Sequence, residues 1–172
     1  EIVPFNIGID QLVAKRPRGI VFSGGPSSVY GENAPKCDDR VFRLGIPILG
    51  ICYGMQLTAH VLGGEVRHAS AREYGKTNLY IDQNSGIFAE IPPETQVWMS
   101  HGDYIARPPA DFAVTAHTNH TPVAAMANDR QRIYGVQFHP EVVHTPEGLK
   151  MIRNFLFNVC GCKGDWDMGS FV

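Results

Sequence analysis

The sequence predicts an α/β fold in which an open, mostly parallel, twisted sheet is flanked by helices. Strand-like apolar runs alternate with helix-like patterns, and glycine and proline separate them. Two of these runs, residues 46–51 and 132–138, end beside a cysteine and a histidine. Open α/β sheets place their sites at the carboxyl ends of strands, so we expect the chemistry at these two ends.

The remaining elements follow the same patterns in chain order. Strands are expected at residues 2–5, 19–22, 78–81, 96–99, 112–116 and 123–126, and helices at 36–44, 55–62 and 146–159. The pair Gly63 and Gly64 is a stop signal for the helix that begins near residue 55. In the last helix, Leu149, Phe155 and Leu156 share an apolar face that we expect in the core.

The composition is that of an ordinary globular domain and excludes several classes of function. The net charge is −2 and the only tight basic run is residues 15–18, which argues against a nucleic-acid partner. No apolar run approaches the roughly 18 residues of a membrane span, so no membrane partner is expected. The four cysteines show neither zinc-site nor disulfide spacing. We therefore expect a cytoplasmic protein without a bound metal.

Residues 50–54 are the most informative segment, because they place Cys52 between Gly50 and Gly54. A sharp strand-turn-helix elbow needs small residues two positions either side of its nucleophile. The amino end of the following helix favours a thiolate over a thiol. The alternative is a buried, inert cysteine, which is common in apolar stretches. The flanking glycines favour a reactive Cys52.

A general base for this cysteine is available at the end of the strand at residues 132–138. His139 and Glu141 are two positions apart, so in an extended segment they point to the same side, and Pro140 supports that conformation. Glu141 would orient His139 toward Cys52. Taken alone the segment reads as a surface turn, but the elbow makes a triad the better interpretation.

Two further polar segments complete the candidate site. The backbone N–H groups of Tyr53 and of Gly25, in the glycine-rich loop at residues 23–28, suit an oxyanion hole. Phosphate binding is the weaker interpretation of this loop, which lacks the Gly-Lys-Ser/Thr ending of a P-loop. The turn at residues 100–103 offers groups that bind the charged end of an amino acid.

Residues 23–26, 50–56 and 135–141 together resemble the class I glutamine amidotransferases. The resemblance covers nearly the whole chain, with the motifs in the family's order. Residues 53, 99–103 and 142–145 most resemble the branch of the family that aminates xanthosine monophosphate to GMP. It implies that Cys52 attacks the side-chain amide of glutamine and that His139, oriented by Glu141, protonates the leaving ammonia. The implied substrate-binding residues are Gln56, Asn78, Ser100, His101, Gly102 and Asp103.

The resemblance also implies a larger assembly. Residues 1–160 would form the glutaminase domain, without the family's first strand and helix and without a cofactor. Residues 161–172 would be a linker to an absent ATP-using synthetase domain, in the same or a partner chain, where ATP and Mg²⁺ bind. A homodimer would form through these absent parts. The open alternatives are a subunit of another amidotransferase, such as anthranilate synthase, a γ-glutamyl cysteine hydrolase, and a non-catalytic interaction module.

Overall fold

The computed structural model describes residues 1–164, apart from the side chains of residues 70–72. Within this range one sheet of seven strands has the order β1-β2-β7-β6-β5-β3-β4. The strands are β1 (Ile20–Phe22), β2 (Ile48–Ile51), β3 (Glu65–Ile81), β4 (Glu94–Arg107), β5 (Ala113–His117), β6 (Ala125–Asn128) and β7 (Ile133–Val136). The helices are α1 (Ile9–Ala14), η1 (Asp39–Arg43), α2 (Tyr53–Val61), η2 (Gly86–Phe88), α3 (Gly148–Arg153) and η3 (Asn154–Val159).

The predicted α/β class is confirmed, but the expectation of a mostly parallel sheet is wrong. Strand β2 pairs in parallel with β1 and β7, whereas the pairings β7–β6, β6–β5, β5–β3 and β3–β4 are antiparallel. The connections between β5, β6 and β7 are only a few residues long, which allows antiparallel neighbours but not a parallel crossover. The runs predicted at residues 78–81 and 96–99 belong to one long hairpin, β3–β4.

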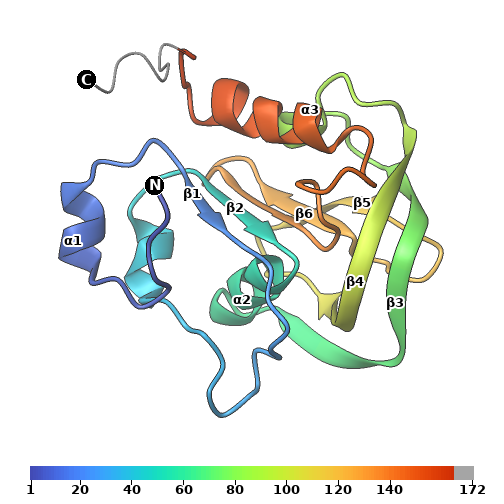
Figure 1. Cartoon of the computed structure of the whole chain (residues 1–172), viewed down its shortest axis with the longest axis horizontal. Helices are drawn as coiled ribbons and strands as arrows, with labels where there is room; N and C mark the ends of the chain where they lie inside the picture. Colours follow the sequence, from blue (N-terminus) through green and yellow to red (C-terminus); the bar gives the residue numbers. More distant parts are fainter. Residues whose placement is uncertain (165–172) are drawn as a thin grey trace.

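The sheet has helices on both faces (Figure 1). Ile48 of β2 packs in the cluster that includes Met55 of α2, and Leu49 packs in the other cluster with Met151 of α3. Residues next to each other in a strand point to opposite faces, so a buried strand contributes to two cores. All four residues of β2 are buried.

Three local predictions need correction. Residues 2–5 form no strand: Pro4 has no N–H for a ladder, and its carbonyl accepts from Ile7 in a turn. The expected helix at 36–44 is only the 3₁₀ turn η1. The last helix opens into a π-helix at η3, and Leu149, expected in the core, is 72% exposed. The predicted linker at residues 161–172 lies partly outside the described residues.

The turn between β2 and α2 depends on two glycines that allow close backbone contacts. A Cβ built on Gly50 would lie 2.6 Å from the carbonyl oxygen of Gly54, and one on Gly54 would lie 2.6 Å from Cβ of Phe22 in β1. Real Cβ atoms do not approach so closely, so larger residues would push α2 away from the parallel strands. No helix in the described part of the chain is long and apolar enough to cross a membrane.

We expect Gly54→Ala to destabilise the fold by about 2 kcal/mol, because the new methyl group overpacks the contact between α2 and β1. The matched control is Gly25→Ala, whose Cβ would meet its nearest atom, Cβ of Tyr53, at an ordinary 3.8 Å. Urea denaturation of both variants measures the difference. Equal free energies of unfolding for the two variants would contradict the role assigned to Gly54.

Candidate active site

Cys52 occupies the turn between β2 and α2 in a strained backbone conformation. Its φ is 51° and its ψ is −107°, a region that non-glycine residues avoid at a cost of about 1–3 kcal/mol. Its N–H donates to the carbonyl of Val136 at 2.8 Å, which ties the turn to the end of β7. The residue is 4% exposed and lines a cavity. The strained turn therefore presents the sulfur to a cavity at the carboxyl ends of β2 and β7.

His139 and Glu141 form the pair that the sequence predicts. Nδ1 of His139 lies 2.7 Å from Oε1 of Glu141. The backbone of His139 is fixed by Trp98, whose carbonyl accepts from its N–H at 3.0 Å, and by Thr145, whose hydroxyl donates to its carbonyl at 2.7 Å. Hydrogen bonds to the backbone of His139 and to Nδ1 of its ring thus both orient the imidazole.

The pKa of His139 is raised to about 9. The hydrogen bond with Cys52 is the largest cause, burial acts against it, and the hydrogen bond with Glu141 adds to the rise. At neutral pH the imidazole is therefore protonated beside the sulfur. An imidazolium next to a cysteine at a helix amino terminus is the arrangement that stabilises a thiolate.

The glycine-rich loop closes over this pair. A Cβ on Gly24 would lie 2.9 Å from Cε1 of His139 and 3.5 Å from Cβ of Cys52, so only glycine fits here without moving the histidine. Gly25 faces Tyr53, whose Cβ is the nearest atom to a Cβ built on that glycine. Tyr53 is the first residue of α2, where backbone N–H groups have no partner within the helix. The two residues predicted to supply the oxyanion donors thus lie next to each other.

A cavity of about 560 Å³ joins these groups to most of the other predicted residues. It is lined by Gly25, Pro26, Ser27, Ser28, Cys52, Gln56, His68, Tyr74, Ser100, His101, Gly102, Asp103 and His139. Asn78 is not among these residues: it is exposed on β3 and donates to Glu94 at 2.9 Å. Glu141 reaches the cavity only through His139, and the phenol of Tyr53 donates to the carbonyl of Pro35 at 2.6 Å.

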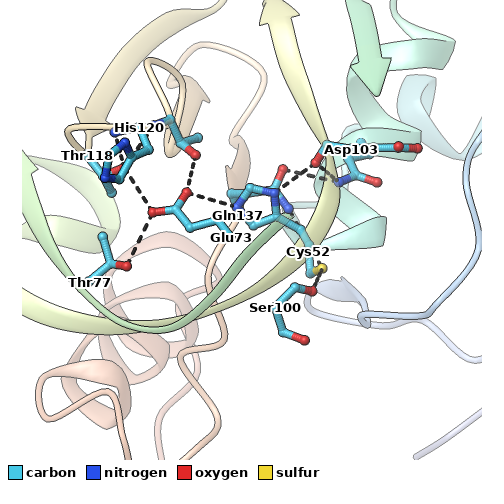
Figure 2. Close-up of polar contacts among 11 residues, drawn as sticks. Cys52, Glu73, Thr77, Ser100, Asp103, Thr118, His120 and Gln137 are labelled. Atoms are coloured by element: carbon cyan, nitrogen blue, oxygen red, sulfur yellow. Dashed lines mark hydrogen bonds and ion pairs between the residues drawn. The ribbon is translucent and has the colours of Figure 1, made fainter. Parts of the chain in front are cut away.

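A buried polar cluster lies behind the cavity, and its contacts are drawn in Figure 2. Nε2 of His101 lies 3.4 Å from Oε2 of Glu73, and the same carboxylate accepts from the hydroxyl of Thr121 at 2.5 Å. Burial raises the pKa of Glu73, but the hydrogen bonds from His101 and Thr121 outweigh it and leave that pKa below its ordinary value. The cavity thus has a carboxylate with fixed charge behind its β3–β4 wall.

The sequence motifs did not single out Glu73 or Gln137. Glu73 reaches the cluster because the β3–β4 register shifts between His68 and Glu73, and a bulge of this kind leaves little trace in a sequence. Gln137 lies within the motif at residues 135–141 but received no role. Its position two residues before His139, on the same side of an extended segment, was the signal that could have found it.

No group of three or more His, Cys, Asp or Glu side chains within residues 1–164 is placed to hold a metal ion. His117 instead pairs with Asp82 at 2.9 Å, and His68 pairs with Asp103 at 2.7 Å. The four cysteines are free thiols.

A strained cysteine between a strand and a helix, beside a carboxylate-paired histidine, is typical of cysteine-dependent α/β hydrolases. The family model of the class I glutamine amidotransferases matches residues 1–159. The chain belongs to this family of enzymes.

Within this family, the chain is similar to proteins that are named GMP synthases. The chain is 56% identical over all 172 residues to the glutamine-hydrolysing GMP synthase of Clostridium perfringens and to that of Carboxydothermus hydrogenoformans. It spans 34% of the length of each. A crystal structure from Thermoplasma acidophilum, assigned by its name to a GMP synthase, matches with a TM-score of 0.79 and 34% identity, over 94% of this chain and 80% of that one.

We expect the imidazole protons of His139 to titrate near pH 9 in NMR spectra, against an ordinary value of 6.5. Cys52→Ala should lower the midpoint more than Glu141→Gln, because the hydrogen bond with Cys52 is the larger cause. Since the folded pKa is the higher one, the associated stabilisation is complete below about pH 6.5 and is lost as the pH rises through about 9. A midpoint near 6.5 in the unmodified protein would contradict this geometry.

Proposed function

We propose that this chain hydrolyses the side-chain amide of glutamine and supplies the ammonia for the amination of xanthosine monophosphate to GMP. The observation that carries the hydrolysis is the cavity that Cys52 and His139 line together, with Glu141 paired to His139 behind it. The assignment to GMP synthesis rests on the relatives: they are named GMP synthases, and their similarity to this chain covers its whole length.

In the first half of the reaction, Sγ of Cys52 attacks the amide carbon of glutamine and the carbonyl electrons move to the oxygen. The N–H groups of Gly25 and Tyr53 stabilise this oxyanion. When the oxyanion collapses, the C–N bond breaks, and the nitrogen takes the electron pair together with the proton from His139. Ammonia leaves and a glutamyl thioester remains on Cys52.

In the second half, His139 is neutral and accepts a proton from water as the water oxygen attacks the thioester carbon. The C–S bond then breaks, and Cys52 leaves as a thiolate paired with the imidazolium. Glu141 keeps the imidazole in the orientation that both steps need. Glutamate is released and the starting state returns.

The polar wall of the cavity suits the amino-acid end of glutamine. Both amide hydrogens of Gln56 are engaged, with the carbonyl of Asp103 at 2.9 Å and with Oε1 of Gln137 at 3.2 Å. Gln56 therefore contacts substrate through its own carbonyl oxygen, an acceptor that suits an ammonium group. Asp103 supplies negative charge, and Ser100, His101 and Gly102 contribute to the same wall. Asn78 takes no part in this binding site.

The synthetase step requires protein beyond this chain. The chain spans 34% of the length of its GMP synthase relatives, so we place ATP and Mg²⁺ in an additional synthetase domain and dimerisation in those further parts. Residues 1–160 would be the glutaminase domain and residues 161–172 the linker. The free thiols of all four cysteines support a reducing, cytoplasmic setting.

A glutamine-mimicking electrophile, applied with and without excess glutamine and mapped by mass spectrometry, tests this function. We expect one adduct, on Cys52, that glutamine suppresses. Burial raises the pKa of the thiols of Cys37 and Cys160 to about 11, so these two serve as internal controls that stay unlabelled at pH 7.

Labelling spread over the other cysteines, or an adduct on Cys52 that glutamine does not suppress, would contradict the proposal. Preferential protection by γ-glutamyl peptides would favour the γ-glutamyl hydrolase instead. The same labelling on the full-length protein, with ammonia release measured in the presence of ATP and xanthosine monophosphate, tests the GMP assignment. Stimulation by another acceptor, such as chorismate, would overturn it.

A further inference from the structure

The side chain of Gln137 reaches the nucleophile from inside the protein. It is fully buried, and its Nε2 lies 3.7 Å from Sγ of Cys52 (Figure 2). It belongs neither to the triad nor to the wall of the cavity. A buried amide beside a reactive sulfur affects the chemistry through whichever of its two ends faces the sulfur, because one end donates hydrogen bonds and the other accepts them.

The hydrogen-bond partners fix which end that is. The carbonyl of Asp103 can only accept, so the group of Gln56 that lies 2.9 Å from it must be the NH₂ group. The second hydrogen of this NH₂ points to Gln137 at 3.2 Å, which requires the oxygen of Gln137 on that side. The NH₂ group of Gln137 therefore faces the sulfur.

The far end of this relay lies against the side chains of His101 and Glu73. The carbonyl of Asp103 also lies 3.0 Å from Nδ1 of His101, while Nε2 of the same ring faces Glu73 at 3.4 Å. Nδ1 donates to this carbonyl, whereas Nε2 has no hydrogen-bond partner in the described part of the chain. The carboxylate is fixed in turn by the hydroxyls of Thr121 and Thr77. These contacts hold the carbonyl of Asp103 in place. That carbonyl orients the amide of Gln56, which in turn orients the amide of Gln137.

The groups that surround the sulfur act in opposite directions. The carbonyl of Ser100 in β4 lies 3.7 Å from Sγ and, as an acceptor, favours the protonated thiol. The imidazole of His139 and the amino terminus of α2 favour the thiolate. The other charged groups of this region, Asp103 and the His101–Glu73 pair, lie on β3 and β4. The amide N–H of Gln137 opposes the Ser100 carbonyl, because a thiolate accepts this hydrogen bond more strongly than a thiol does.

We propose that Gln137 is a positioning residue that holds the sulfur of Cys52 as a thiolate, with its amide oriented through Gln56 by the carbonyl of Asp103. The proposal rests on the proposed function only for the reaction that the thiolate serves. The state of the sulfur itself is measured without glutamine.

The test is the pH dependence of Cys52 alkylation by iodoacetamide, followed by mass spectrometry. Gln137→Met keeps an unbranched side chain of similar size but removes the donor. We expect its half-maximal rate at a pH about one unit higher, which is an about tenfold slower reaction at the acidic pH values where the thiol is the major form. Gln137→Glu keeps the acceptor for Gln56 and replaces the NH₂ group by an oxygen, so its shift should be larger.

Two further variants separate orientation from packing. Gln56→Met removes the hydrogen bond that orients the amide of Gln137, so we expect the pH of half-maximal alkylation to rise. In the double variant with Gln137→Met, the rise should be no larger than in Gln137→Met alone. Asn128→Asp is the matched control, because it also changes a buried amide to a carboxylate. Asn128 is at the end of β6 that lies away from Gln137, and its side chain hydrogen-bonds with Gln131. Its alkylation profile should coincide with that of the unmodified protein.

Unchanged profiles for Gln137→Met and Gln137→Glu, in proteins whose urea midpoints show them to be folded, would overturn the proposal. Should Gln137→Glu fail to fold, Gln137→Met alone decides. An equal shift in Asn128→Asp would also overturn it, because a general loss of stability would then explain the result. Failure of glutamine hydrolysis, with the shifts intact, would contradict the proposed function and leave the role of Gln137 standing.

Discussion

The close approach of α2 to the parallel strands is the contact on which the site depends. Gly54 touches the end of β1 at Phe22, and Gly50 touches the first turn of α2, at distances that no side chain would tolerate. This contact forces Cys52 into its positive φ and points the amino terminus of α2 at the cavity. The strain at Cys52 persists because the surrounding core determines the position of both elements.

The antiparallel arm supplies what the parallel strands lack. The glycine-rich loop follows β1, the nucleophile follows β2 and the histidine follows β7, all at the carboxyl ends of these parallel strands. The hairpin of β3 and β4 adds the polar wall from Ser100 to Asp103 and fixes His139 through the carbonyl of Trp98 (Figure 1). The site thus lies between the carboxyl ends of the parallel strands and β4, which is at the other edge of the sheet order. Both parts of the sheet line the cavity of about 560 Å³.

The groups that carry local signals could be predicted from the sequence. Flanking glycines mark Cys52, and spacing in an extended segment pairs His139 with Glu141. The polar residues 100–103 follow a strand-like run, but the turn expected there is wrong, because they continue strand β4. Each of these signals involves residues only a few positions apart, so it can be recognised without knowledge of the tertiary fold.

The contacts set by distant register could not be predicted. Glu73 joins His101 through a bulge in β3, and Gln56 meets Gln137 across 81 positions of the sequence. Asn78 was expected at the site, but its position in β3 places it beside Glu94. Leu149 was assigned to the core by its helical spacing, but α3 buries the face that carries Gly148 and Met151 instead. In each case the tertiary packing of the strand or helix overrode the local pattern.

In the mechanism that we propose, Cys52 forms a covalent bond with the glutamyl group while His139 delivers the proton to the leaving ammonia. Mixing the protein with glutamine, quenching in acid within the first turnovers and mapping the peptides by mass spectrometry tests it directly. We expect a glutamyl adduct on the peptide that contains Cys52, labile to hydroxylamine as a thioester is. Ammonia released without any adduct on Cys52, or an adduct on another residue, would contradict it.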